Sequence, residues 1–174
     1  MRRLIADVAA RGVAPMGCIV GEPTGMELVL AHKGKKGWRC RVRGFEAHSS
    51  LTPHGVNAVE IACQIVAHVA QRAREFRDAG TRDDAYDVPY TTAHVGTIRG
   101  GTALNIVPRD CHFDFELRHL PFDDPDAFLR DVRAYAERFL PQMRAVAPDT
   151  WIEFDALSAL PGMDTHDGSE VAAL

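Results

Sequence analysis

The sequence predicts an α+β fold, a two-layer sandwich in which a four-stranded antiparallel sheet carries two helices on one face. Strict alternation of apolar and polar residues over 38–43 and 111–118 is typical of strands with one buried and one solvent-exposed face. Residues 56–76 and 125–140 instead repeat apolar side chains at helical spacing. From residue 28 the elements follow one another as strand, helix, strand, strand, helix, strand, which is the ferredoxin-like, split βαβ order.

The first part of the chain is predicted to form separate elements. Residues 1–11 are typical of a short helix that Gly12 ends. Residues 18–20 are expected to form a short buried strand, broken by a Gly-Glu-Pro-Thr turn, and 28–31 a second strand region. Because residues 1–24 do not fit the split βαβ unit, we expect them to belong to a different domain.

The two alternating strands carry opposite charges on their wet faces. Arginines line that face of 38–43 and acids that of 111–118, so they could pair across the open face of the sheet for about a few tenths of a kcal/mol each. The residues expected to point inward are Trp38, Cys40, Val42, Cys111, Phe113, Phe115 and Leu117.

The helix expected at 56–76 has an unusually wide apolar arc. It follows a polar loop at 45–55 and should end near Gly80. One apolar flank contains Ile61, Ile65 and Val69, and a distinct second flank contains Val59, Cys63, Val66 and Ala70. One sheet face cannot cover both flanks, so another domain or a second copy of the chain should cover the rest, unless the helix is wedged deeply in its own core.

The second helix has clear boundary signals. Asp124 is its expected N-cap, Pro125 its first residue and Pro141 the residue that ends it. The remaining elements are a strand at 91–98, a tight turn at 100–101, a strand at 151–156 and a tail from 158 without a clear period.

Composition excludes several classes of function. The charges, 20 Lys+Arg against 24 Asp+Glu, argue against a nucleic-acid binder. No apolar run approaches the roughly 18 residues of a membrane span, and the start lacks the apolar core of a signal peptide, so we expect a cytoplasmic protein. The four cysteines form no CxxC pair and are expected to be buried reduced thiols, and the eight histidines form no HExxH metal motif.

Four residues are candidates for chemistry. Glu22, at the end of a predicted strand, is either a rigidly held metal ligand or general base, or an acid in an exposed turn. His48, in a loop, could hydrogen-bond an oxyanion. Asn105 could orient a polar group of a substrate or merely complete a turn, and Arg118 could bind a substrate carboxylate or form a cross-strand ion pair with an acid on the same face.

Several ordered motifs together resemble one enzyme family. They are Gly-Glu-Pro-Thr-Gly-Met at 21–26, Ala-His-Lys-Gly at 31–34, Ala-His-Ser-Ser at 47–50, Gly-Val-Asn-Ala at 55–58, Gly-Gly-Thr-Ala-Leu-Asn-Ile-Val-Pro at 100–108 and Phe-Asp-Phe-Glu-Leu-Arg at 113–118. They resemble the acetylornithine deacetylase and succinyl-diaminopimelate desuccinylase family of dinuclear zinc amidohydrolases and peptidases, over nearly the whole chain.

The resemblance implies a lid, or dimerisation, domain at 27–157. Residues 1–26 would be a remnant of the catalytic domain with its hinge, and 158–174 a segment returning to that domain. Glu22 would be a zinc ligand, and His48 would reach across a homodimer to polarise the scissile carbonyl in the partner's active site. Asn105 would contact the substrate and Arg118 would bind its carboxylate.

The implied reaction is hydrolysis of N-acetyl-L-ornithine to ornithine and acetate, a step of arginine biosynthesis, in which a metal-bound hydroxide attacks the acetyl carbonyl. The alternatives within the family are a desuccinylase or another N-acyl amino-acid hydrolase or metallopeptidase. The alternative of another class is a dimerisation module without a catalytic role.

The family's remaining metal and catalytic motifs are absent from this sequence. The His-x-Asp motif, the bridging Asp, the Glu-Glu pair and the late histidine are missing, and His166 does not occupy the position of that histidine. A full-length enzyme would hold two zinc or cobalt ions, whereas we expect none to bind stably to this chain and no hydrolysis by the chain alone.

Overall fold

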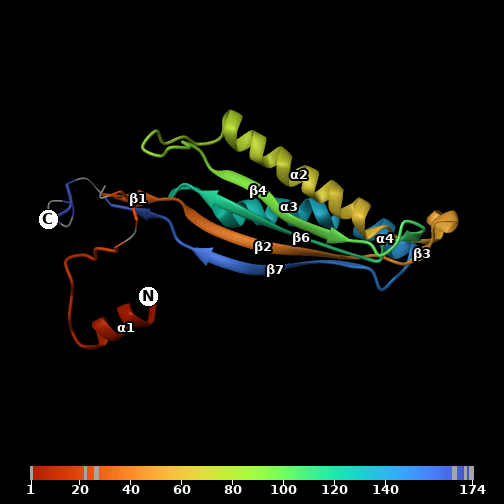
Figure 1. Ribbon diagram of the computed structural model, residues 1–174, viewed down its shortest axis with the longest axis horizontal. Coiled ribbons are helices and arrows are strands. Elements are labelled where there is room, and N and C mark those ends of the chain that lie inside the picture. Colours follow the sequence, from red (N-terminus) through yellow and green to blue (C-terminus); the bar gives the residue numbers. More distant parts are fainter. Residues whose placement is uncertain (1, 22, 26–27, 166–167, 171, 173–174) are drawn as a thin grey trace. The chain divides into compact units, whose positions relative to one another are not determined.

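The computed structural model describes residues 2–21, 23–25, 28–165, 168–170 and 172 (Figure 1). The chain divides into two compact units. Unit 1 comprises Met1–His32 and Met163–Leu174, and unit 2 comprises Lys33–Gly162.

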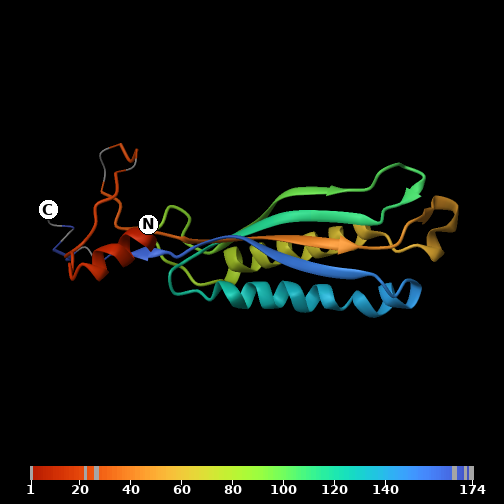
Figure 2. The ribbon, with the colours of Figure 1, turned by 90° about the horizontal axis from the view of Figure 1, so that it is seen from below.

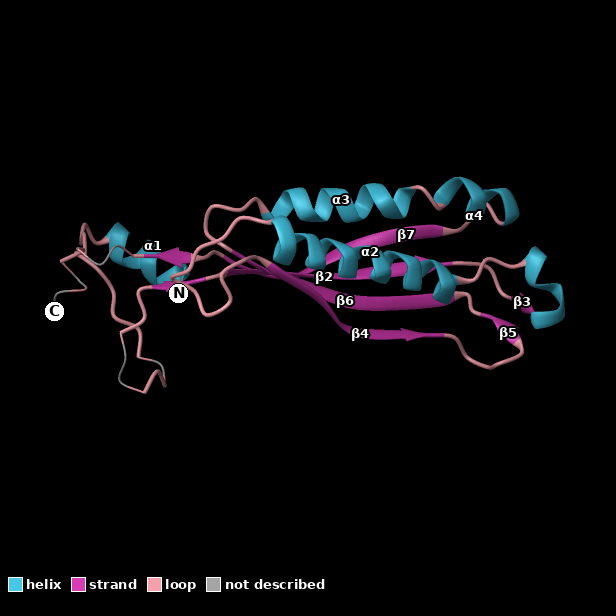
Figure 3. Ribbon diagram, turned by 90° about the horizontal axis from the view of Figure 1, so that it is seen from above, coloured by secondary structure: helices cyan, strands magenta, loops and turns pink. Residues whose placement is uncertain are grey.

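Unit 2 is built on a four-stranded sheet in the order β4-β6-β2-β7, in which every neighbouring pair is antiparallel. Figure 3 shows the four strands side by side. The strands are β2 (Gly34–Arg43), β4 (Thr92–Gly100), β6 (Asp110–His119) and β7 (Trp151–Leu160). With the helices, this order confirms the predicted split βαβ fold.

Both main helices lie against one face of this sheet (Figure 2). Helix α2 (Ala58–Ala79) begins after Asn57, whose side chain accepts hydrogen bonds from the backbone N–H groups of Val59 and Glu60. These bonds satisfy two of the amide groups that a helix start leaves without a partner.

Helix α3 (Pro125–Glu137) confirms the predicted N-cap, because the Asp124 side chain accepts a hydrogen bond from the backbone N–H of Asp126. The predicted end at Pro141 is wrong. Helix α3 stops at Glu137, and Pro141 lies in the first turn of a further helix, α4 (Leu140–Val146). Proline is tolerated there because the first turn of a helix needs no N–H donor.

The core between sheet and helices contains every residue expected to point inward from the two alternating strands. The rings of Trp38 and Phe115 are tilted relative to each other with centroids 5.4 Å apart, and Phe128 of α3 completes the aromatic cluster. The other buried members include Cys40, Val42, Cys111, Phe113, Leu117, Ile61, Ile65, Val69, Val132 and Ala136.

The two flanks of α2 differ in exposure. Ile61, Ile65 and Val69 are buried against the sheet. On the second flank, Cys63 and Ala70 are exposed, and Val59 and Val66 are only partly buried. Within the described residues the second flank is therefore only partly covered, which argues against the alternative of a helix wedged deeply in its own core.

The open face of the sheet confirms the expected charge pairing. Arg39 makes two hydrogen bonds to the Asp114 carboxylate, at 2.7 and 2.9 Å, and Arg43 lies 2.8 Å from Asp110. Each pair joins directly opposed residues of β2 and β6.

Unit 1 contains α1 (Arg2–Ala10) and a short antiparallel pair, β1 (Ala31–His32) with β8 (Met163–Asp164). The prediction of a strand at 18–20 is wrong, since these residues have no regular structure and the Ile19 side chain is 74% exposed. The second expected strand is reduced to β1: within the described residues, 28–30 form no strand, although the Leu30 carbonyl accepts a hydrogen bond from the Thr165 N–H. An isolated strand without a paired neighbour is not stable.

The thiols are all free, but only Cys40 and Cys111 are buried. The expectation of burial is wrong for Cys18, which lies in the irregular part of unit 1, and for Cys63, which lies on the second flank of α2. No helix in the described part of the chain combines the length and apolar character needed to cross a membrane.

Candidate functional site

The segment expected as a loop at 45–55 is ordered by a two-stranded sheet and a 3-10 helix. Strand β3 (Ala47–His48) pairs with β5 (Ile106–Val107), and the 3-10 helix η1 (Ser49–His54) follows directly. These elements lie beyond the end of the main sheet at which β2 stops and β6 begins (Figure 3). The sequence pattern missed them because each strand is only two residues long.

The β3–β5 pairing brings two candidate residues together. His48 is opposite Ile106, and the backbone N–H of Ser49 donates a 2.9 Å hydrogen bond to the carbonyl oxygen of Asn105. Both His48 and Asn105 are exposed. The structure therefore presents an imidazole and a carboxamide at the same end of unit 2, although 57 residues separate them in the chain.

The His48 ring is fixed by its place at the start of η1. Its Nδ1 accepts a 3.2 Å hydrogen bond from the backbone N–H of Ser50 and lies 2.9 Å from the Ser50 hydroxyl oxygen. A nitrogen that accepts from a backbone N–H carries no proton, so the neutral ring has its proton on Nε2. The free edge of the imidazole is therefore a hydrogen-bond donor. Sequence reasoning missed the role of Ser50, since only the cap geometry reveals it.

The segment between β4 and β5 forms a projecting turn. Gly101 has a φ of +78°, in the left-handed region, and its N–H donates to the carbonyl of Asp110 at 3.2 Å. Leu104 at the tip is fully exposed. Such a side chain, next to Asn105 and outside any core, is available for contact with another molecule.

Arg118 lies at the opposite end of β6. Its Nε is 3.0 Å from the Glu116 carboxylate, which also pairs with Lys35 at 3.2 Å. Burial favours protonation of Glu116, but hydrogen bonds from Arg118 and Lys35 outweigh this effect and lower its pKa. Arg118 thus forms an ion pair with an acid on the same face, but the partner lies on its own strand β6 and not across the sheet as expected.

Within one chain, Arg118 is remote from His48 and Asn105. Eight residues of strand separate Arg118 from Asp110, where β6 begins, and this length corresponds to about 26 Å. A single copy of the chain does not bring these three residues together.

The fourth candidate, Glu22, lies outside the described residues, as does His166, to which no role is assigned. Among the residues that the structure describes, no group of three or more His, Cys, Asp or Glu side chains is arranged to hold a metal ion.

Comparison with known proteins gives consistent matches. Residues 30–144 match the peptidase dimerisation domain. Acetylornithine deacetylase of Pasteurella multocida is 35% identical over 109 residues, which are 63% of this chain and 28% of the relative. The acetylornithine deacetylase of Edwardsiella ictaluri is 34% identical over 113 residues, 65% of this chain and 29% of the relative. The chain thus spans less than a third of the length of these relatives.

The fold is also found among solved structures. The aminopeptidase PepT from Bacillus cereus aligns with 83% of this chain and 34% of its own, with a TM-score of 0.61 and 23% identity. At this level of identity the comparison establishes a shared fold.

Proposed function

We propose a function from the premise that this chain belongs to the peptidase dimerisation domain family. The chain is the lid of an amidohydrolase that acts on N-acylated amino acids, and the preferred substrate is N-acetyl-L-ornithine. The lid would supply a hydrogen-bond donor and a carboxylate-binding group to catalytic sites formed with a second copy. The similarity to acetylornithine deacetylases supports this substrate over the succinylated one.

The orientation of His48 carries the proposal. The Ser50 backbone N–H holds Nδ1 as an acceptor, which leaves Nε2–H facing outward at an exposed position. A fixed donor of this kind stabilises the negative charge that develops on a carbonyl oxygen when an amide is attacked. Asn105 lies beside it as a second polar group that could orient the substrate.

The test is replacement of His48 by alanine in the complete enzyme that contains this lid. We expect His48→Ala to lower kcat by roughly 10²–10³ with little change in KM, because an oxyanion donor acts mainly in the transition state. His54→Ala is the matched control, since His54 is exposed on the same 3-10 helix. Equal kcat for His48→Ala and wild type would remove the role, and a panel of N-acyl amino acids would identify the substrate.

The separation within one chain supports a site shared between two copies. Because Arg118 and His48 lie at opposite ends of β6, one substrate would meet Arg118 of one copy and His48 of the other. Mixing His48→Ala and Arg118→Ala enzymes then creates heterodimers with one intact site. We expect such a mixture to recover about a quarter of the wild-type activity, far above the residual activity of either variant alone. No recovery after subunit exchange would contradict the shared site.

The second flank of α2 is the surface we propose for self-association. It lies beside β4, whose outer edge pairs with no strand among the described residues. A second copy could cover the flank and extend the sheet at this edge. We expect Ala70→Arg, at the C-terminal end of the flank, to convert a dimer to a monomer in sedimentation experiments. Gln64→Arg on the polar side of α2 should leave the dimer intact, and equal behaviour of both variants would exclude this surface.

Enzymes of this peptidase family are metal-dependent. The described residues do not fit a metal centre, because they include no cluster of three or more suitable ligands. Any metal in the complete enzyme would therefore depend on residues outside this set, and the lid's own contribution is the positioning of His48, Asn105 and Arg118.

A further inference from the structure

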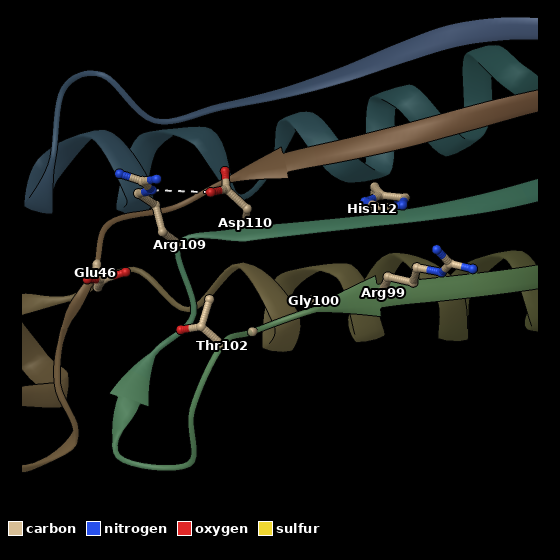
Figure 4. A pocket seen from close by; sticks show the side chains of 8 residues that line it. Glu46, Arg99, Gly100, Thr102, Arg109, Asp110 and His112 are labelled. Carbon is tan, nitrogen blue, oxygen red and sulfur yellow. Dashed lines mark hydrogen bonds and ion pairs between the residues drawn. The ribbon is translucent and has the colours of Figure 1, made fainter.

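A pocket of about 280 Å³ opens where β4 and β6 meet the projecting turn (Figure 4). Its floor includes the backbone of Gly100 and Gly101. The side chains around it are Glu46, Arg99, Thr102, Arg109, Asp110 and His112. None of the three residues assigned to catalysis or substrate binding lines it.

Two of the lining charges neutralise each other. Arg109 lies 3.2 Å from one oxygen of Asp110, and Arg43 lies 2.8 Å from the other. Burial opposes ionisation of Asp110, but the hydrogen bonds from both arginines outweigh it and lower its pKa. Each carboxylate oxygen of Asp110 therefore already contacts an arginine, and the charge of this residue is compensated within the chain.

Two other charged groups at the pocket differ from Asp110. Among the described residues, neither the Arg99 guanidinium nor the Glu46 carboxylate makes a hydrogen bond or an ion pair. Arg99 and His112 are directly opposed on β4 and β6, so both side chains leave the sheet on the same face. In Figure 4 they lie at one end of the pocket, Glu46 lies at the other, and Thr102 lies between.

We propose that this pocket binds a small zwitterion in which a short aliphatic chain separates a carboxylate from an ammonium group. The Arg99 guanidinium would bind the carboxylate through two parallel N–H donors, with His112 beside it. Glu46 would accept hydrogen bonds from the ammonium group, and the Thr102 hydroxyl would face the middle of the ligand. This inference does not rest on the proposed deacetylase function, because it uses neither His48, Asn105 nor Arg118.

The test is a titration of the 174-residue chain with 5-aminopentanoate, in which binding is measured by changes in the amide chemical shifts of NMR spectra. We expect shifts at Gly100, Gly101 and His112, and weaker binding of pentanoate and pentylamine, each of which carries only one of the two charges. Arg99→Gln should weaken binding of 5-aminopentanoate at least tenfold. Glu46→Gln should do the same for 5-aminopentanoate but leave pentanoate binding unchanged.

Arg144→Gln is the matched control, because Arg144 is an exposed arginine on α4 outside the pocket. It should bind 5-aminopentanoate like wild type. The proposal is overturned if no shifts appear at roughly 50 mM ligand. It is equally overturned if the pocket variants bind like the control, or if pentanoate and pentylamine bind as well as the zwitterion.

Discussion

The imidazole of His68 in α2 stacks on the ring of Tyr135 in α3, with centroids 4.1 Å apart and planes within 1° of parallel. The His68 Nε2 also lies 2.8 Å from an oxygen of Asp131, and the Arg72 Nε lies 3.3 Å from the same oxygen. One carboxylate oxygen of α3 is therefore hydrogen-bonded to His68 and within ion-pair distance of Arg72, and the two helices are joined by polar contacts as well as by the core.

We expect Asp131→Ala to lower the free energy of unfolding by about 1 kcal/mol, because it removes the hydrogen-bond partner of His68 and the ion-pair partner of Arg72. The carboxylate is 41% exposed, so solvent limits the loss. Urea denaturation measures the change. Asp149→Ala is the control, since Asp149 is exposed in the turn before β7 and makes no contact with a charged group in the described part of the chain. An equal loss in both variants would show that the shared oxygen contributes nothing.

A second prediction concerns the pH dependence of stability. The hydrogen bonds from Arg39 are the largest influence on the Asp114 carboxyl and lower its pKa, although burial opposes them. A carboxyl whose pKa is lower in the folded state stabilises the protein above the unfolded-state pKa of about 4, and this contribution is lost as the pH falls through the folded-state value.

Asp114→Asn should therefore be less stable than wild type at neutral pH, and the difference should shrink at about pH 3. Urea denaturation at both pH values gives the two differences. Asp149→Asn, outside any ion pair, should show no such trend. A difference between Asp114→Asn and wild type that stays constant with pH would rule out this linkage.

Much of unit 2 could be predicted because its signals are local and repeated. The alternation around Trp38 and Phe115 fixes which face of each strand is buried, and the sign of the charges on the wet face indicates which strands are neighbours. Asp124 and Pro125 identify a helix start by the chemistry of two adjacent residues. Long elements with consistent patterns determine their own structure.

The candidate site was harder to predict because it depends on contacts between distant, short segments. Nothing in the sequence near His48 indicates the two-residue pairing that places it beside Asn105. The orientation of its ring depends on one backbone N–H at Ser50, which no composition pattern reveals. The strand expected at 18–20 fails for the opposite reason, since an apolar pattern forms a strand only where another strand is available to pair with it.

The cysteines should differ sharply in reactivity. Burial raises the pKa of Cys111 to about 11, with a smaller contribution from Cys63, and burial likewise raises the pKa of Cys40. Both thiols remain protonated at about pH 8, whereas the thiolate is the reactive form. We expect iodoacetamide to label Cys63 and Cys18 first, as measured by mass spectrometry of peptides.

The same experiment tests the proposed self-association. If a second copy covers the second flank of α2, labelling of Cys63 should slow as the protein concentration rises, whereas labelling of Cys18 should not. Concentration-independent labelling of Cys63 would argue against that surface. Labelling of Cys40 or Cys111 in the folded protein at the rate of Cys63 would contradict their burial.

The close approach of Gly34 to His119 yields the last prediction. Both residues are buried and directly opposed on β2 and β6, and the His119 Nδ1 lies 2.9 Å from the Leu120 carbonyl oxygen. A Cβ at position 34 would collide with the imidazole and come within 2.9 Å of the Gly162 nitrogen. Gly34→Ala should therefore lower the free energy of unfolding by about 1–3 kcal/mol, the usual cost of overpacking.

A double-mutant cycle separates this collision from a general effect of replacing glycine. Removing the ring in His119→Ala should relieve most of the conflict, so the loss in the double variant should be smaller than the sum of the single losses by at least about 1 kcal/mol. Gly96→Ala in β4 is the control, because a Cβ there would meet nothing closer than 3.7 Å. If the losses in the free energy of unfolding were strictly additive, or equal in Gly34→Ala and Gly96→Ala, the His119 imidazole would not be the reason that position 34 requires glycine.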